Sequence, residues 1–244
     1  MQENLLVTKN VVKRFGGLTA VKEVSIEVKK GEIFGIIGPN GAGKTTFLNC
    51  VSGIYTPEEG EIIYKGVNIK GLSSHVLCKK GIARTFQIVR SFHKMTALDN
   101  VKVAVIFGSD KVQNPDERAK ELLDYVNFPL PVETLASNLN TVQLKYLELA
   151  RALATDGELL LLDEVAAGLT PGELGEFIDL IRKIRDSGVT VISIEHVMKF
   201  IMTICDRIAV IHYGEKIAEG TPEEIVNNKL VIEAYLGKEH AKTN

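Results

Sequence analysis

Cysteine is scarce in this sequence, and the spacing of the few that occur argues against two kinds of site. The chain of 244 residues has 3 cysteines, and Cys50, Cys78 and Cys205 are far apart among apolar neighbours. An odd number without a C-x-x-C pair fits neither a disulfide framework nor a cysteine-based metal site. We therefore expect these cysteines to be reduced thiols in the core.

No charge of one sign predominates. The 29 Lys and Arg residues are balanced by 31 Asp and Glu residues, for a formal net charge of −2. A protein that binds nucleic acid through its phosphates needs a basic excess, so we expect no nucleic-acid partner.

Long apolar runs are missing as well. The window richest in apolar residues, 189–204, contains Glu195, His196 and Lys199, whereas a membrane-spanning helix needs about 18 uninterrupted apolar residues. Residues 1–7 have neither the basic nor the apolar region of a signal peptide. We expect a protein that stays in the cytoplasm and reaches a membrane only by docking on a protein that spans it.

The rest of the composition is that of an ordinary globular protein. Hydrophobic residues make up 45% of the chain and charged residues 25%, and the length allows a substantial core in one or two compact units. We find no internal repeat and no low-complexity segment. Strand patterns and helix patterns both occur along the chain, which indicates an α/β fold.

The most informative stretch is a glycine-rich loop at residues 38–45. It matches the pattern G-x-x-x-x-G-K-[ST] and lies between a strand-like run at 33–37 and a helical pattern that includes Phe47. Such a loop wraps phosphates with its backbone amides, while Lys44 neutralises the β and γ phosphates and Thr45 binds Mg²⁺. The alternative is a glycine-rich turn between a strand and a helix. The nucleotide-binding residues that we expect here are Gly38, Pro39, Asn40, Gly41, Ala42, Gly43, Lys44, Thr45 and Thr46.

Polar side chains also follow two later strands. Residues 159–162 form an unbroken apolar run, typical of a parallel strand covered on both faces, and Asp163 and Glu164 follow directly. Open α/β sheets bind ligands at this end of their strands. Another strand-like run, 189–194, ends shortly before His196. The alternative for the two carboxylates, taken alone, is that they are acidic residues at the start of a helix. The alternative for His196 is a structural histidine at the end of a strand, with its hydrogen bonds satisfied within the protein.

The remaining patterns predict the elements around this site. Residues 4–12 and 20–28 read as strands, the second with the alternation of an antiparallel strand that has one wet face. We interpret Phe15, between them, as a ring that stacks on adenine, or else as an aromatic packed beside a turn. We expect further strands at 61–65, 81–86, 189–194, 207–212 and 216–219, and a polar surface loop at 108–118. We expect helices at 97–106, from the end of that loop to about 126, at 141–154, at 171–186, after Thr221 and near the end of the chain.

The order of these features resembles a known family. The loop at 38–45, Gln87, the start of the helix at 141, the run 159–164 and His196 together resemble the ATP-binding subunits of ABC transporters, over almost the whole chain. Within that family, several short segments are similar to the ATP-binding subunits of branched-chain amino-acid importers. They are 14–18, 83–87, 95–96 with 99–101, 164–169 and 231–237.

The resemblance implies a fold and a domain plan. We expect a P-loop NTPase core, a mixed sheet flanked by helices, with an antiparallel β subdomain and a helical insertion subdomain. Residues 1–244 would form one ATP-binding domain. Its nucleotide-binding core would comprise 1–87 and 141–219, its helical subdomain 88–140, and its C-terminal helical tail 220–244.

The resemblance also implies roles for single residues, with ATP and Mg²⁺ as cofactors. Glu164 would polarise the attacking water, His196 would contact the γ phosphate and orient that water, and Lys44 would complete the catalytic set. Asp163 would hold Mg²⁺ through water, with Thr45 and Gln87 in the polar shell of the metal. The nucleotide-binding set further includes Phe15, Val21 and Gln87.

The implied partners are transmembrane permease subunits and a second ATP-binding subunit, either another copy or a different chain. The protein would then lie peripherally on the cytoplasmic face of the cell membrane, and the transported substrate would never touch it. The apolar residues after Gln87, namely Ile88, Val89, Phe92 and Met95, are either the docking surface for the permease or packing within the insertion.

The chain departs from the family at the signature motif. Where ABC ATPases carry Leu-Ser-Gly-Gly-Gln, this sequence has Leu139, Asn140, Thr141, Val142 and Gln143. Asn140 and Gln143 keep a capping box, so the helix still begins here. A β-branched Val142 prevents the close backbone approach that glycine allows. Val165 and Thr170 also replace the usual proline and Asp or Asn. We therefore predict slow hydrolysis by this chain alone and stimulation by a second subunit with an intact signature.

Two other functions remain as alternatives. The ATPase of lipopolysaccharide export or of another exporter shares the domain plan. The lipopolysaccharide export family, however, lacks the motif Arg-Thr-Phe-Gln that this chain has at residues 84–87. A soluble regulatory or DNA-maintenance ATPase is the alternative from a different class. The balanced charge and the lack of a long coiled coil weigh against it.

Overall fold

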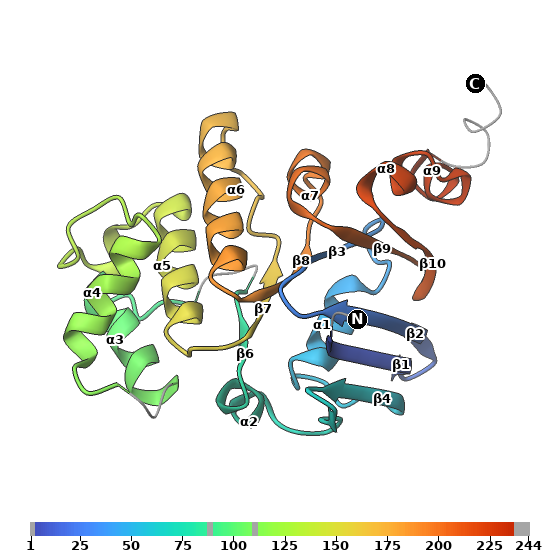
Figure 1. Ribbon diagram of the computed structural model, residues 1–244, viewed down its shortest axis with the longest axis horizontal. Helices are drawn as coiled ribbons and strands as arrows, with labels where there is room; N and C mark the ends of the chain where they lie inside the picture. The colour runs from blue at the N-terminus through green and yellow to red at the C-terminus, as the bar shows by residue number, and fades with distance from the viewer. Residues whose placement is uncertain (1–2, 87–89, 109–111, 237–244) are drawn as a thin grey trace.

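The computed structural model describes residues 3–86, 90–108 and 112–236, and within these ranges the strands form two sheets (Figure 1). The smaller sheet is antiparallel, in the order β2-β1-β4-β5. Its members are β1 (Asn4–Phe15), β2 (Leu18–Lys29), β4 (Glu59–Tyr64) and β5 (Val67–Asn68).

The larger sheet is mixed, in the order β10-β9-β3-β8-β7-β6. Five of its strands are parallel neighbours: β3 (Ile33–Ile37), β6 (Ile82–Arg84), β7 (Leu159–Asp163), β8 (Thr190–Ile194) and β9 (Arg207–His212). β10 (Glu215–Gly220) pairs antiparallel with β9. Because parallel strands end at the same edge of a sheet, the segments that follow β3, β6, β7 and β8 meet there.

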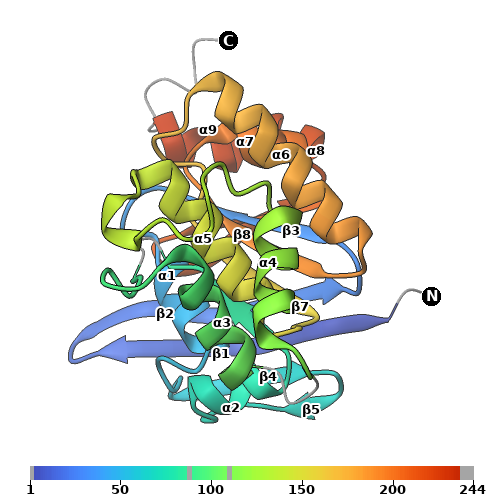
Figure 2. The same ribbon diagram turned by 90° about the vertical axis from the view of Figure 1, so that its left-hand side faces the viewer.

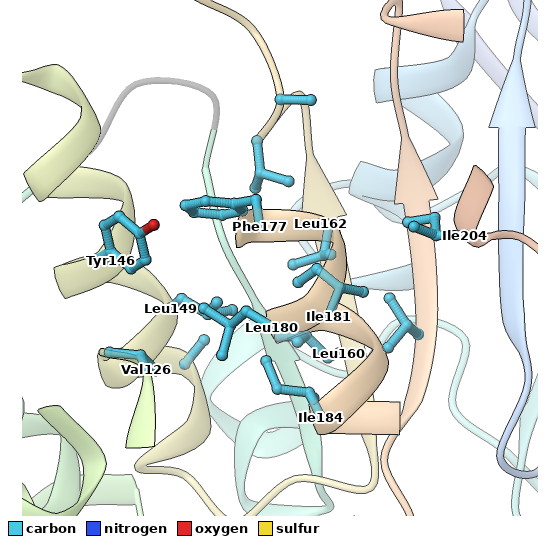
Figure 3. Packing of buried hydrophobic residues seen from close by; sticks show 14 of the residues in the cluster. Val126, Tyr146, Leu149, Leu160, Leu162, Phe177, Leu180, Ile181, Ile184 and Ile204 are labelled. Atoms are coloured by element: carbon cyan, nitrogen blue, oxygen red, sulfur yellow. The ribbon is translucent and has the colours of Figure 1, made fainter. Parts of the chain in front are cut away.

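Both faces of the larger sheet are covered, as the apolar run at 159–162 predicts. Leu160 and Leu162 of β7 belong to a cluster that includes residues of the helices, whereas Leu159 and Leu161 belong to a second cluster with residues of α1 (Lys44–Val51) and of the antiparallel sheet. Figure 3 shows the first cluster, with Phe177 lying beside Leu162. The mixed sheet flanked by helices and the separate antiparallel sheet confirm the predicted α/β architecture.

Most helices lie where their patterns predict them. α3, α4 and α5 pack together beside the larger sheet (Figure 2). Besides α1, the helices are α2 (Ser74–Lys79), α3 (Ala97–Gly108), α4 (Pro115–Tyr125), the 3₁₀ turn η1 (Ala136–Asn138), α5 (Thr141–Leu153), α6 (Pro171–Asp186), α7 (Met198–Ile204), α8 (Pro222–Val226) and α9 (Lys229–Leu236). The helical subdomain at 88–140 and the C-terminal helical tail at 220–244 stay predictions.

Two predictions about elements were wrong, and two helices were not predicted. The predicted polar loop at 108–118 ends early, because the Asn114 side chain accepts from the Glu117 amide and Pro115 starts α4. Strand β6 ends at Arg84 rather than at 86. The helices α2 and α7 were missed: α2 buries only Leu77, so its sequence has no apolar stripe, and α7 is a single short segment of seven residues.

Cys50 and Cys205 are buried and Cys78 is half-buried, and all of them are free thiols. Across the part of the chain that the structure describes, no group of His, Cys, Asp and Glu side chains is arranged to hold a metal ion by itself. No helix in the described ranges has the length and apolar character that a bilayer crossing requires.

Candidate nucleotide-binding site

The loop between β3 and α1 borders a cavity of about 740 Å³. Residues from four separate parts of the chain line it. They are Phe15, Leu18 and Ala20 at the β1–β2 hairpin, residues 40–46 of the loop and the first turn of α1, and Glu164 and His196 at the ends of β7 and β8. The tertiary structure thus brings the predicted phosphate loop and two of the predicted catalytic side chains to one cavity.

Two glycines of the loop occupy positions that other residues do not fit. A Cβ on Gly38 would lie 1.9 Å from the Ile211 carbonyl oxygen, and one on Gly43 would lie 2.2 Å from the Ala20 carbonyl oxygen. Gly43 also has φ of 103°, directly before α1. The loop is therefore held tightly against β2 and β9 while the start of α1 faces the cavity. The first amides of a helix have no partner within the helix and bind anions.

Lys44 is buried, with 5% of its surface exposed. Its ammonium group donates to the carbonyl oxygens of Gly38 at 2.7 Å and Pro39 at 3.0 Å. Burial lowers the pKa of Lys44, and the carboxylates of Glu164 and Asp163 oppose that shift. The lysine therefore lies near the acidic pair, as a residue between phosphate and carboxylates would.

Glu164 and His196 are in direct contact. A hydrogen bond joins Oε1 of Glu164 to Nε2 of His196. The pairing follows from the parallel neighbours β7 and β8, since the Glu164 amide donates to the Ile194 carbonyl oxygen at 2.9 Å. Glu164 has φ of 54°, a left-handed conformation that is uncommon outside glycine. The side chain of Glu164 is 11% exposed and that of His196 is 41% exposed, so the pair lies at the wall of the cavity.

Asp163 lies deeper and has an unexpected partner. Its Oδ2 atom accepts from Nη2 of Arg84 at 2.8 Å, and both side chains are buried, at 3% and 7% exposure. Nη1 of Arg84 donates to Asn49 Oδ1 at 2.7 Å and to Ser52 Oγ at 2.6 Å. Burial raises the pKa of Asp163, and Arg84 partly offsets the rise. The Oδ1 atom of Asp163 is buried and has no hydrogen-bond partner among the described residues.

Arg84 belongs to the family phrase at 83–87, and the sequence predicts no role for it. A signal existed, because Arg84 ends the strand β6, which is the parallel neighbour of β7. The two residues therefore stand at the same edge of the sheet. Recognising this requires the strand order, which the sequence does not state.

The hairpin side of the cavity differs in part from the prediction. Phe15 lines the cavity, is 43% exposed and meets Tyr55 edge-on, with ring centroids 5.2 Å apart. Val21 is 1% exposed and belongs to the core, and Leu18 and Ala20 line the cavity instead. The alternation along β2 explains this, since Val21 and Ala20 lie on opposite faces of a strand.

The other predicted site residues differ in whether the structure places them at the cavity. Thr45 lines it, but Gln87 lies outside the described residues, as do Ile88 and Val89. The signature-like residues 139–143 are at the start of α5 and do not line the cavity. Their capping box is present: the Gln143 amide donates to Asn140 Oδ1, and the Asn140 amide donates to Gln143 Oε1, both at 2.9 Å.

The segment after Glu164 is anchored by two charged side chains that sequence reasoning also missed. Lys145 of α5 donates to the carbonyl oxygens of Val165 at 2.7 Å and Ala167 at 2.6 Å. The Ala166 amide donates to Glu195 at 2.7 Å. Burial raises the pKa of Glu195 to about 7. These contacts fix the backbone next to Glu164 from two different elements.

A second cavity, of about 300 Å³, lies on the other side of Arg84. Its walls come from the ends of α1 and β6 and from α2, α3 and α5, and they include Phe86, Arg90, Ala104 and Arg151. Arg84 lines this groove while it binds Asp163.

The chain matches two family models. Residues 21–167 match the model described as ABC transporter, and residues 215–241 match the model described as branched-chain amino acid ATP-binding cassette transporter. The chain is 41% identical to the high-affinity branched-chain amino acid transport ATP-binding proteins LivG of Salmonella typhimurium and BraF of Pseudomonas aeruginosa, over 98% of this chain and 100% of each relative. It is 33% identical to the lipopolysaccharide export system ATP-binding protein LptB of Escherichia coli, over 96% of this chain and 98% of that protein.

Solved structures give the same result. A nucleotide-free ATP-binding cassette from an ABC transporter matches with a TM-score of 0.88 and 29% identity, over 97% of this chain and 100% of the other. A cassette in its ADP conformation matches with a TM-score of 0.87 and 29% identity, over the same shares. A dimeric cassette in a post-hydrolysis state with ADP and phosphate matches with a TM-score of 0.81 and 27% identity, over 89% of this chain and 98% of the other.

Proposed function

The chain belongs to the ATP-binding proteins of ABC transporters, and we propose that it hydrolyses ATP to drive an importer of branched-chain amino acids. The observation that carries the catalytic part is the contact between Glu164 and His196 at a cavity whose opposite wall is the phosphate loop. The likeness to transport proteins for branched-chain amino acids over 98% of the chain, together with the match at 215–241, supports the choice of substrate.

ATP binding would use the loop and the hairpin. The amides at the start of α1 and residues 40–46 surround the place for the phosphates, and the exposed Phe15 offers a ring to the adenine. Lys44 now donates to two carbonyl oxygens of its own loop. Because a phosphate carries more negative charge than a carbonyl, the ammonium group would move to the β and γ phosphates when ATP binds.

Hydrolysis would then depend on Glu164 and His196. The oxygen of a water molecule attacks the γ phosphorus while the bond from that phosphorus to the bridging oxygen of ADP breaks. Glu164 accepts a hydrogen bond from the water and aims it, and His196 holds Glu164 and lies next to the place for the γ phosphate. Glu164 directly follows the last residue of β7 and has a left-handed backbone, a conformation that persists where the surrounding structure fixes it.

The residues near the phosphate place fit a magnesium ion. Thr45 provides a hydroxyl at the cavity, and Asp163 provides a buried carboxylate oxygen without a partner in the described ranges. Hard divalent cations prefer such oxygen donors. When bound, the ion would neutralise charge on the phosphates. Gln87, which lies outside the described residues, is proposed as a further donor.

A permease subunit is the proposed occupant of the groove beside Arg84, on the cytoplasmic face of the membrane. The described part of the segment after Gln87 borders this region: Phe92 is 46% exposed, with the Arg151 guanidinium 5.5 Å from its ring centroid. Buried Asn100 holds the backbone of Phe92, accepting from its amide at 2.8 Å and donating to its carbonyl at 3.1 Å. A fixed backbone with an exposed ring is typical of a docking surface.

The second ATP-binding subunit is proposed to be a different chain with an intact signature motif. Asn140 and Thr141 are exposed at the start of α5, so a partner's nucleotide can reach them, but Val142 replaces the glycine that close approach needs. A mixed pair would keep one competent site, formed by the phosphate loop and carboxylates of this chain and the signature of its partner.

Reconstitution tests the proposed function. Native complex captured through this chain is expected to contain membrane subunits, and in proteoliposomes ATP hydrolysis should rise when a leucine-loaded or valine-loaded binding protein is added. The same complex carrying Lys44→Ala should neither hydrolyse ATP nor transport. Stimulation by lipopolysaccharide instead would favour an exporter, and recovery of the chain without any membrane subunit would favour a soluble regulatory ATPase.

A further inference from the structure

Arg84 connects the two elements that carry the proposed magnesium donors. Through Nη2 it binds Asp163 at the end of β7, and through Nη1 it binds Asn49 and Ser52. Asn49 is on α1 and Ser52 ends that helix, whose first turn contains Thr45. One guanidinium group therefore ties the strand that carries Asp163 to the helix that carries Thr45.

The geometry leaves one oxygen of Asp163 available. Oδ2 is held by Arg84, whereas Oδ1 is buried and has no hydrogen-bond partner within the described residues. A carboxylate that is held at one oxygen cannot rotate freely, so its second oxygen has a fixed direction. Partners that orient metal ligands in this way have large effects on metal affinity.

Arg84 is suited to this role by its own surroundings. Its planar fork has donors that reach acceptors on two sides, which a single ammonium group does not match. The side chain is 7% exposed, so water does not compete strongly for its hydrogen bonds. The face of Phe86 lies against it, with the guanidinium carbon 5.2 Å from the ring centroid. The guanidinium is thus immobilised on three sides.

We propose that Arg84 is a positioning residue for magnesium, which sets the direction of the Asp163 carboxylate and its distance from Thr45. This inference rests on the proposed function, because it concerns the same nucleotide site. Arg84 itself touches neither nucleotide nor metal in this proposal and acts only through Asp163.

The test measures how nucleotide binding depends on magnesium. Binding of a fluorescent ATP analogue to the purified chain is followed while magnesium is raised from an EDTA baseline, which gives the magnesium concentration at half-saturation. For Arg84→Met we expect this concentration to rise about tenfold or more, as for the loss of other residues that orient metal ligands, with Arg84→Lys between it and the wild type. Affinity for the analogue in EDTA should stay within about threefold of the wild type, because the loop amides and Lys44 are intact.

Arg207→Met is the matched control. Arg207 pairs with the buried Glu32 at 3.2 Å, and this pair stands at the opposite edge of the same sheet, where β9 and β3 begin. If loss of any arginine that pairs with a buried carboxylate disturbed the site, both variants would raise the half-saturating magnesium concentration. Only Arg84→Met should do so.

Two further variants make the result independent of folding defects. The double variant Asn49→Ala, Ser52→Ala keeps the charge of Arg84 and removes its anchor on α1, so it should shift the half-saturation in the same direction by a smaller factor. In an Asp163→Asn background, Arg84→Met should add no further shift.

An unchanged or lower half-saturating concentration in Arg84→Met would overturn the inference, and a lower one would mean that Arg84 competes with the metal. Equal shifts in the Arg84 and Arg207 variants, or a further shift in the Asp163→Asn background, would overturn it too. Failure of the wild type to bind the analogue at any magnesium concentration would instead contradict the proposed function.

Discussion

At the scale of single residues, the proposed catalytic side chains and their neighbours have an unusual backbone conformation or a shifted pKa. Glu164 has a left-handed backbone and a histidine partner. Glu195, one residue before that histidine, is 1% exposed, and burial raises its pKa to about 7. Such strained or buried groups cost stability and persist where the surrounding structure fixes them. Substitutions at such strained or buried groups therefore have predictable effects.

Glu164→Gln should separate binding from hydrolysis. The amide is similar in size but a far weaker acceptor for the proton of the attacking water, so we expect nucleotide affinity to be retained and turnover to fall by about 100-fold or more. Phosphate release and binding of a fluorescent ATP analogue measure the two effects. The control is Glu133→Gln at an exposed position outside the site. Turnover close to that of the wild type would refute the role of Glu164.

Glu148 predicts a pH dependence of stability. Burial raises the pKa of Glu148 from 4.5 to about 7, although its Oε1 accepts from the Phe86 amide at 2.7 Å. Between pH 4.5 and 7 the folded chain keeps a proton that the unfolded chain has released, so this contribution to the free energy of unfolding is complete below pH 4.5 and is lost as the pH rises through 7. The loss is at most about 3 kcal/mol.

Glu148→Gln removes this titration and still offers an acceptor to Phe86. Its melting temperature should exceed that of the wild type at pH 8, and the two should converge near pH 5. Calorimetry over this range measures the difference, and Glu121→Gln, on the exposed side of α4, should follow the wild type. Parallel curves for the wild type and Glu148→Gln would show that burial of Glu148 has no such cost.

At the scale of elements, helix starts carry much of the local information. α5, α6 and α8 each begin with a capping box, formed by Asn140 with Gln143, Thr170 with Glu173, and Thr221 with Glu224. In α5 the cap survives although the motif around it differs from the family signature. The sequence at this position therefore preserves the helix and alters the surface that a partner's nucleotide would meet.

Asn140→Ala should lower the free energy of unfolding by about 1 kcal/mol, because the Gln143 amide loses its acceptor. Asn140→Ser should restore most of the loss, since serine caps helices about as well as asparagine. Urea unfolding curves measure both variants. Equal midpoints for the alanine and serine variants would show that the cap adds nothing.

At the scale of the whole molecule, the proposed function needs a second chain to complete the site. The cavity brings together the phosphate loop, Glu164 and His196, whereas residues 139–143 begin a helix elsewhere on the surface. In the proposed arrangement a dimer places a signature over the nucleotide, and solved relatives include a dimeric cassette with ADP and phosphate. Because the signature of this chain is altered, we propose that the rate of ATP hydrolysis depends on which subunit it pairs with.

A chain with a restored signature motif should hydrolyse ATP without a different partner subunit. The triple variant Asn140→Ser, Thr141→Gly, Val142→Gly is expected to hydrolyse ATP by itself about tenfold faster than the wild type, because backbone donors can then approach the phosphate. Adding Glu164→Gln to the triple variant should abolish the gain. Fast, cooperative hydrolysis by the unaltered chain alone would contradict the prediction of an impaired signature.

The sequence by itself determined the features that are local. The glycine pattern of residues 38–45, the run before Asp163 and the caps of α5 and α8 are set by neighbouring residues, and the structure contains the elements that they predict. The polar start of α4 and the helices α2 and α7 escaped prediction, because α2 buries only one side chain and α7, with seven residues, is too short to show a period.

Only the tertiary structure decided which residues meet. The contact of Glu164 with His196 spans 32 positions, and that of Arg84 with Asp163 spans 79. Both arise because β6, β7 and β8 are parallel neighbours that end at one edge of the sheet. Strand order is fixed by the packing of the whole core, to which every element contributes, so no local pattern contains it. Arg84 therefore shows no role in the sequence, whereas in the fold it is the buried partner of Asp163.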